Sequence, residues 1–183
     1  MGGTTAKICL IKGQTPKTSR VFEVARTYRF KKGSGMPISI PVIDMVEIGA
    51  GGGSLAHVDA MRQIRVGPES AGSEPGPACY GRGGARPAVT DADLVLGKLD
   101  PDNFAGGSIR LHPSASQSAL THHVGQTLHM DAAEAAFGVA EVVDENMANA
   151  ARVHAVENGE DLSDYTMIAF GGAAPLHAGR LCE

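Results

Sequence analysis

The chain has 183 residues, enough for one domain with a hydrophobic core, and we expect a single domain rather than two. Apolar residues make up 43% of it and charged residues 20%, a balance that excludes a disordered chain. No apolar run is long enough to cross a bilayer and no signal-peptide pattern opens the chain, so we expect a cytoplasmic protein without a membrane partner. Three widely spaced cysteines without a CxxC pair argue against a disulfide framework or a zinc site.

The net charge of −4 hides an excess of positive charge at the N-terminus. Residues 1–32 carry eight Lys or Arg side chains and a single acidic one, Glu23. Such a basic arm fits either nucleic-acid binding through residues 7–32 or a solvated hairpin whose lysines protect an edge strand. Few aromatic residues lie among these charges, so the hairpin is the preferred interpretation and no nucleic-acid partner is expected.

The first third of the chain has the pattern of β-structure. Apolar and β-branched residues over 5–11 and alternating residues over 21–30, separated by turn-forming residues, predict a long β-hairpin. Residues 42–48 predict a further strand, which ends at the glycine-rich sequence GAGGGS.

The middle of the chain is expected to be rich in loops. Residues 55–66 alternate in polarity, whereas residues 67–87 hold so many Gly and Pro that no regular element is expected there. A short helix follows, with Thr90 or Asp91 as its N-cap. The carboxylates of Asp91 and Asp93 are candidates for holding Mg²⁺ through water, although helix capping explains Asp91 equally well.

The last third of the chain is predicted to be mainly helical. Residues 113–130 are compatible with a helix, and the DxxE sequence from Asp131 predicts a capping box that begins a long helix reaching about residue 158. Residues 164–181 then predict a strand, a Gly-Gly turn and a helix with Pro175 in its first turn. One face of the long helix is predicted to pack closely against its surroundings, from the helical spacing of Ala136, Ala140, Val143, Met147, Ala150 and His154.

Three glycine-rich segments are candidates for contact with a ligand. The opening MGGTT offers unhindered N–H groups and hydroxyls that suit phosphate, although a flexible chain start would read the same way. The FGGAA sequence at 170–174 has the strand–turn–helix form that places an anion at a helix N-terminus, with a plain turn as the alternative. GAGGGS at 49–54 is not followed by a predicted helix, so we reject a dinucleotide-binding fold and expect a turn that brings backbone near a ligand or a neighbouring loop.

Two side-chain pairs raise the question of catalysis. Cys79 lies near Arg82 in a loop, which would suit a thiol nucleophile, but a buried and inert cysteine is the preferred interpretation. His57 and Asp59 share one face of an alternating segment and could bind a metal or act as a base, with a structural pair favoured.

The remaining polar candidates lie on predicted helices. Three histidines without acidic or thiol neighbours at ligand spacing are expected to be solvated: His122, His123 and His129. Polar residues among the alanines of the long helix are candidates for a functional role: Asn146, Asn149 and Arg152.

Six segments taken together resemble the hydantoinase A/5-oxoprolinase family, and they occur in that family's order along the whole chain. They read MGGTTAK, VIDMVEIGAGGGSLAHVD, RVGPESAGSEPGPACYGRGG, PAVTDADLVLGKLDPDNFAGG, ENMANAARV and IAFGGAAPLHA. The resemblance implies an α/β (mixed α+β) fold of the actin-like ATPase, ribonuclease H-like type. The chain would be one partial domain of it, β-rich over 1–112 and helical over 113–183.

The same resemblance implies a nucleotide site that uses ATP with Mg²⁺ or another divalent cation. Its cofactor-binding residues fall on the second phosphate loop, the central glycine turn and the adenosine motif. They are Gly2, Gly3, Thr4, Thr5, Gly51, Gly52, Gly53, Gly171, Gly172 and Ala173. The aspartate that normally precedes the phosphate loop is absent here, and no catalytic residue or metal ligand is assigned.

By this resemblance the protein is a segment of an ATP-dependent hydrolase that opens a cyclic amide after phosphorylating it. The alternatives are a subunit of an ATP-dependent carboxylase and a catalytically silent interaction module. The expected partners are a small cyclic amide, an N-terminal half or partner subunit that completes the cleft, and further copies of the chain in a homo-oligomer. We expect the segment alone to be inactive.

Overall fold

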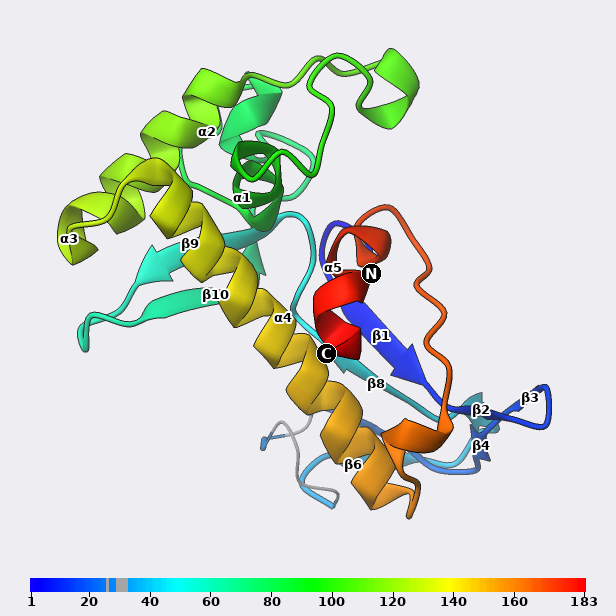
Figure 1. The fold of residues 1–183 in the computed structure, drawn as a ribbon. Coiled ribbons are helices and arrows are strands. Elements are labelled where there is room, and N and C mark those ends of the chain that lie inside the picture. The colour runs from blue at the N-terminus through cyan, green and yellow to red at the C-terminus, as the bar shows by residue number, and fades with distance from the viewer. Residues whose placement is uncertain (26, 29–32) are drawn as a thin grey trace. The chain divides into compact units, whose positions relative to one another are not determined.

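The computed structural model describes residues 1–25, 27–28 and 33–183, which form short paired strands and several helices (Figure 1). The mixed α/β character predicted from the sequence is confirmed. The strands are β1 (Ala6–Cys9), β2 (Ile11–Lys12), β3 (Thr15–Pro16), β4 (Thr18–Ser19), β5 (Phe22–Val24), β6 (Met36–Ile38), β7 (Val42–Ile43), β8 (Met45–Ile48), β9 (Ser54–Val58) and β10 (Ile64–Ser70). The α-helices are α1 (Val89–Val95), α2 (Pro113–Leu120), α3 (Gln126–Leu128), α4 (Ala132–Glu157) and α5 (Ala174–Cys182).

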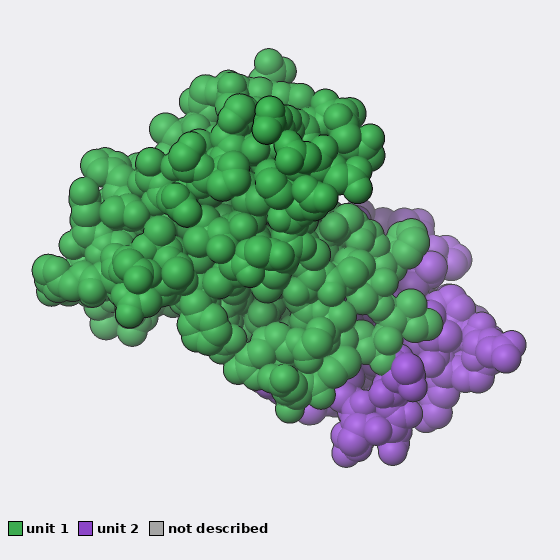
Figure 2. All heavy atoms as spheres, turned by 45° about the horizontal axis from the view of Figure 1, so that its top comes forward, with its two compact units in different colours: residues 1–6, 48–148, 167–183 green, residues 7–47, 149–166 purple. Residues whose placement is uncertain are grey.

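The chain divides into two compact units, which Figure 2 distinguishes by colour. Unit 1 comprises Met1–Ala6, Ile48–Ala148 and Met167–Glu183, and unit 2 comprises Lys7–Glu47 and Asn149–Thr166. All three glycine-rich segments identified in the sequence fall within unit 1, and residues 49–54 lie near the start of its second segment. The single-domain description of residues 1–183 stays a prediction.

The long hairpin predicted for the N-terminal region is wrong. β1 pairs with β8, and β5 pairs with β6, so the two predicted hairpin strands do not pair with each other. A shorter hairpin forms instead between β2 and β3, because Gly13 and Gln14 adopt φ of 57° and 62°. Two successive residues with positive φ give the tight turn that matches the twist of paired strands. The rest of the predicted second strand, at residues 26 and 29–30, lies outside the described residues.

The alternating segment of unit 1 forms an antiparallel hairpin, with Val58 of β9 opposite Ile64 of β10. β10 continues to Ser70, so the prediction of no regular element from residue 67 is wrong at its first residues. The register shifts between Val66 and Ser70, which is how the strand passes Pro68, a residue without an N–H donor.

The long helix α4 is confirmed together with its capping box. The Asp131 carboxylate accepts hydrogen bonds from the N–H groups of Ala133 and Glu134, both at 2.8 Å, and the Glu134 carboxylate accepts one from Asp131 N–H at 2.9 Å. Every residue of the predicted packing face, from Ala136 to His154, is buried. Within the described part of the chain, neither α4 nor any other helix has the length and apolarity that a membrane span requires.

The strand predicted before the Gly-Gly turn is absent: residues 165–170 adopt no regular structure. A strand needs a neighbour to accept and donate its backbone hydrogen bonds, and these residues join none of the described sheets. The side chains of Ile168 and Phe170 are 80% and 86% exposed. The helix predicted after the turn is confirmed as α5, with Pro175 in its first turn.

Candidate functional site

The three glycine-rich segments meet in unit 1 through backbone hydrogen bonds. Gly52 N–H donates to Gly2 O at 2.9 Å, and Gly53 N–H donates to Gly3 O at 2.7 Å. Ala173 N–H donates to Met1 O at 3.3 Å. The expectation that GAGGGS forms a turn near a neighbouring loop is therefore confirmed, and the neighbour is the opening MGGTT segment.

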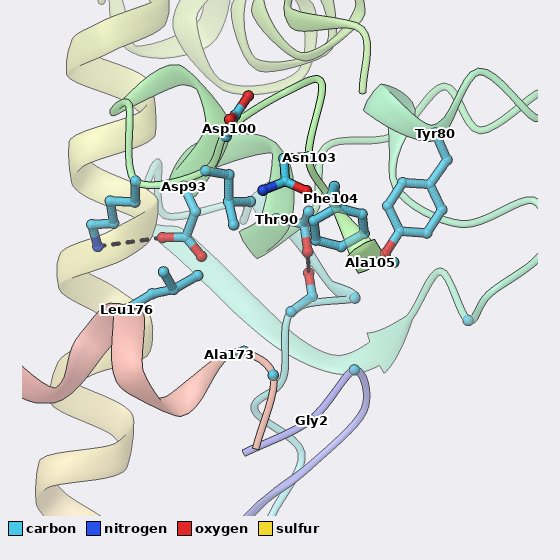
Figure 3. A pocket seen from close by; sticks show the side chains of 17 residues that line it. Gly2, Tyr80, Thr90, Asp93, Asp100, Asn103, Phe104, Ala105, Ala173 and Leu176 are labelled. Carbon is cyan, nitrogen blue, oxygen red and sulfur yellow. Dashed lines mark hydrogen bonds and ion pairs between the residues drawn. The ribbon is translucent and has the colours of Figure 1, made fainter. Parts of the chain in front are cut away.

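These turns line a cavity of about 440 Å³, shown in Figure 3. Its size is in the range of small-molecule sites. Six of the predicted cofactor-binding residues line it: Gly2, Gly3, Gly52, Gly53, Gly172 and Ala173. Four do not: Thr4, Thr5, Gly51 and Gly171. Gly51 instead supports the loop from behind, since a Cβ there would lie 2.6 Å from the carbonyl carbon of Gly3.

The glycines on the cavity wall differ in the physical reason why a side chain is absent. A Cβ on Gly53 would approach Gly3 O to 2.9 Å, so packing between the loops excludes a side chain there. A Cβ on Gly2, Gly3 or Gly172 would meet no atom of the described residues within 4 Å, and none of these three has a positive φ. Neither packing nor backbone conformation explains glycine at these positions, whereas close approach of a ligand to the backbone does.

Backbone donors at this wall are available to such a ligand. In the described part of the chain, the N–H groups of Gly3 and Gly172 donate to no protein acceptor. Unhindered N–H groups at a glycine turn are a typical binding site for phosphate oxygens. The arrangement therefore suits an anionic group that lies against the backbone of the turns.

Thr90 fixes the central glycine turn against α1. Its N–H and its Oγ1 hydroxyl each donate to Gly52 O at 2.8 Å (Figure 3). The sequence suggested Thr90 or Asp91 as the N-cap of this helix, but the N-cap is Ala88 and Thr90 is the second helical residue. The Thr90 hydroxyl does not cap the helix and instead binds the central glycine turn.

Asp91 has a structural role rather than the metal-binding role considered for it. Its carboxylate is fully buried and accepts hydrogen bonds from four donors. These are the N–H groups of Ala78, Cys79 and Ala88 and the hydroxyl of Ser116, at 2.7 to 3.1 Å. The bond from Ala88 N–H completes the helix start, and the others fasten the preceding loop and α2 to it. No lone pair is left for a cation.

Asp93, two residues further on, faces the cavity and belongs to a chain of buried and half-buried charges (Figure 3). Its Oδ1 lies 3.3 Å from Lys98 Nζ, and its Oδ2 lies 3.4 Å from His177 Nε2. His177 Nδ1 in turn lies 2.7 Å from Asp144 Oδ1. We call these four residues, Asp144, His177, Asp93 and Lys98, the ion chain. All three contacts are ion pairs by distance, without the alignment of hydrogen bonds.

The surroundings of His177 favour its charged form. Burial alone would lower its pKa, but the carboxylates of Asp144 and Asp93 outweigh burial and raise the pKa to about 9. The imidazole is therefore an imidazolium at neutral pH. Two carboxylates and two cations then balance within the ion chain, which is the condition for burying such groups.

Cys79 is not a nucleophile. Its side chain is fully buried, and burial together with the nearby Asp91 carboxylate raises the pKa of the thiol. Arg82 does not activate it, because the guanidinium lies over the Tyr80 ring, 5.9 Å from its centroid. Tyr80 and Phe104, whose ring centroids are 5.7 Å apart, give the cavity an aromatic wall.

The other candidate residues lie outside the cavity. Asp59 accepts hydrogen bonds from Met61 N–H, Gln63 N–H and Arg65 Nε, so Asp59 has a structural role and its charged partner is Arg65. Asn149 accepts a hydrogen bond from Arg152 at 3.0 Å on the exposed side of α4. Among the described residues, no group of three or more His, Cys, Asp or Glu side chains is placed to hold a metal ion.

The hydantoinase/oxoprolinase family model matches residues 1–183. The chain belongs to this family. The alpha subunit of caprolactamase from Pseudomonas jessenii is 41% identical over 183 residues, which cover 100% of this chain and 25% of that subunit. 5-oxoprolinase 1 from Arabidopsis thaliana is 35% identical over 161 residues, which cover 79% of this chain and 13% of that protein.

Two solved structures of family relatives superpose on the whole chain. The nucleotide-free structure of acetone carboxylase gives a TM-score of 0.86 at 28% identity, covering 100% of this chain and 25% of that one. The crystal structure of ATP-dependent caprolactamase from Pseudomonas jessenii gives 0.82 at 39% identity, with the same coverage of 100% and 25%. The actin-like α/β fold is thereby confirmed. The chain spans about a quarter of the length of these relatives.

Proposed function

We propose that this chain forms the phosphate-binding wall of an ATP site in an enzyme that opens a cyclic amide. The observation that carries the proposal is the glycine wall of the cavity. Gly2, Gly3 and Gly172 are glycines that neither packing nor φ requires, and the N–H groups of Gly3 and Gly172 donate to no acceptor among the described residues. Relatives named as ATP-dependent acetone carboxylase and ATP-dependent caprolactamase support the choice of ATP as the ligand.

The residues of this chain would bind and orient the nucleotide. The N–H groups of the glycine turns would donate to phosphate oxygens, and Thr90 would keep the central turn in place. Bound ATP would supply a phosphoryl group to the amide oxygen of the substrate, which makes the ring bond susceptible to water. Among the described residues, no cluster of carboxylate, histidine or thiol groups is placed to hold a metal ion, so we derive no step that uses a divalent cation.

The cyclic amide is proposed as the substrate because caprolactamase and 5-oxoprolinase are relatives over most of the chain. A subunit of an ATP-dependent carboxylase is the alternative, since the beta subunit of acetone carboxylase from Xanthobacter autotrophicus is 30% identical over 179 residues. Either enzyme would need residues beyond those of this chain, and we propose that an N-terminal half or partner subunit supplies them. Ring opening of a lactam or hydantoin without added carbonate would favour the hydrolase.

Calorimetric titration of the chain with ATP and MgCl₂ tests the nucleotide site. Adenosine serves as the matched ligand without phosphates. We expect ATP to bind more tightly than adenosine, because the cavity wall supplies donors for phosphate. Equal affinity for the two ligands, or no binding of ATP, would contradict the proposal.

A further inference from the structure

The C-terminal end of α1 carries a charged pair where helix ends usually carry an apolar one. Gly97, with φ of 74°, donates its N–H to Leu94 O at 3.1 Å, and Lys98 N–H donates to Asp93 O at 2.9 Å. These two bonds form a Schellman motif, in which the side chains at the positions of Asp93 and Lys98 are commonly apolar and touch each other. Here they form an ion pair of 3.3 Å instead.

A gain in folding stability does not explain this ion pair. Asp93 is 1% exposed and the Lys98 side chain 27%, so both groups lose most of their hydration. Replacing a buried ion pair by apolar residues is often neutral or stabilising, and the helix end would close equally well with the usual apolar contact. A charged pair in place of the usual apolar contact, on the wall of a cavity, indicates a functional requirement.

The rest of the ion chain holds Asp93 from behind. Oδ2 faces His177 Nε2, and His177 is held in turn by Asp144 on α4. With one cation at each oxygen, Asp93 is poorly suited to act as a base and well suited to fix the position of the Lys98 ammonium. Lys98 lines the same cavity as Gly2, Gly3 and Gly172, and it is the member of the ion chain that keeps partial exposure.

We propose that Lys98 binds phosphate oxygens of the nucleotide, and that Asp93, His177 and Asp144 are positioning residues that hold its ammonium in the cavity. The identity of the ligand rests on the proposed function above. An ammonium with three donors can contact Asp93 and a phosphate oxygen together. Asp100 also lines the cavity, and an ammonium fixed by a buried carboxylate offsets its negative charge.

Binding of ATP and of adenosine to the chain, each in the presence of MgCl₂, tests the role of Lys98. Lys98→Met is expected to weaken ATP binding by about tenfold to a hundredfold, the usual effect of losing a charge-assisted hydrogen bond, and to leave adenosine binding unchanged. Lys98→Arg keeps the positive charge and should restore part of the affinity. Lys7→Met is the matched control, because Lys7 is half exposed, pairs with Glu47 and does not line the cavity.

A double-mutant comparison tests the positioning residues. In the wild-type background, His177→Gln should weaken the binding of ATP but not that of adenosine. In the Lys98→Met background, it should have no further effect on the ratio of the two affinities. A purely structural His177 would weaken both ligands alike in both backgrounds. Should His177→Gln fail to fold, Asp144→Asn replaces it in the same comparison.

The outcomes separate the two proposals. Suppose that the wild-type chain binds ATP more tightly than adenosine and that Lys98→Met shows the same preference. The assignment of Lys98 then fails while the ATP site stands. If the wild-type chain does not prefer ATP, the proposed function fails, and the assignment of Lys98 fails with it.

Discussion

His177 of α5 and Asp144 of α4 lie 2.7 Å apart between Nδ1 and Oδ1, and both side chains are buried. The contact joins the helix that follows the Gly171-Gly172 turn to the long helix of the chain. Because Asp93 on α1 faces the other ring nitrogen, one imidazolium ties three helices together beside the cavity. The charge on this ring is therefore part of the packing of unit 1.

The first prediction concerns the pH dependence of stability. The pKa of His177 is raised from 6.5 to about 9, so its contribution is complete below pH 6.5 and is lost as the pH rises through about 9. We expect the stability advantage of the wild type over His177→Gln to fall by roughly 2–3 kcal/mol between pH 6.5 and pH 10. Urea unfolding of both proteins measures it. Other groups titrate in both proteins, so a constant difference between them would refute the charged state.

The second prediction concerns Asp91. Asp91→Asn turns at least one acceptor atom into a donor that faces N–H groups, so we expect a loss of about 3 kcal/mol or more in the free energy of unfolding. Thermal or urea unfolding is the measurement. Asp102→Asn is the control, since Asp102 pairs with Arg110 on the surface with 70% of its side chain exposed, and it should change stability by less than about 0.5 kcal/mol. Equal effects of the two substitutions would count against the buried role.

The sequence predicts the parts of this structure that depend on local chemistry. The capping box at Asp131, the packing face of α4 and the turn before α5 each follow from residues within a few positions of one another. The convergence of the glycine turns was suggested by the family resemblance, and the structure shows the backbone bonds that produce it.

Features that depend on distant partners were missed. The strand partner of β1 is β8 rather than the next apolar segment, and a choice between such partners leaves no local signal. The ion chain is similar: Asp144 looks like one polar residue on an amphipathic helix, and Lys98 like one surface lysine. The sequence indicates this site only through Asp93, a candidate metal ligand, and through a histidine within the apolar sequence APLHA of α5.

The third prediction follows from the corrected role of Cys79. With no exposed surface and a raised thiol pKa, Cys79 should resist iodoacetamide in the folded protein, while the exposed Cys182 should react. Peptide mass spectrometry after brief labelling measures both sites in one sample, and labelling in urea provides the unfolded reference. Labelling of Cys79 as fast as Cys182 without urea would restore the nucleophile hypothesis.

The fourth prediction concerns self-association. Residues 165–170 join no described sheet, and the apolar side chains of Ile168 and Phe170 are largely exposed. Extended backbone with exposed apolar side chains can add to a strand of another copy, so we expect the chain to form oligomers at high concentration. Light scattering should show a lower mass for the double variant Ile168→Ser, Phe170→Ser. Val156→Ser, which removes a side chain 77% exposed on α4, is the control and should leave the mass unchanged. A wild-type chain that stays monomeric would contradict the expectation.

The last prediction separates the two kinds of glycine in the turns. Gly51→Ala places a Cβ 2.6 Å from the backbone of Gly3, so we expect a loss of about 1–3 kcal/mol in stability. A Cβ at Gly3 or Gly172 meets no protein atom, so alanine there should leave the melting temperature unchanged and weaken ATP binding by about tenfold or more, because the methyl group would occupy the space of the phosphates. Calorimetry and thermal unfolding measure the two effects.

Gly179→Ala in α5 is the matched control for these glycine substitutions. Its Cβ would also meet open space, but Gly179 is a helical residue that does not line the cavity. Alanine there should raise stability by up to about 1 kcal/mol and leave ATP binding as it is. If Gly3→Ala and Gly172→Ala bind ATP as well as Gly179→Ala does, no ligand approaches the turns closely. Ligand binding would then not explain why these positions of the cavity wall are glycine.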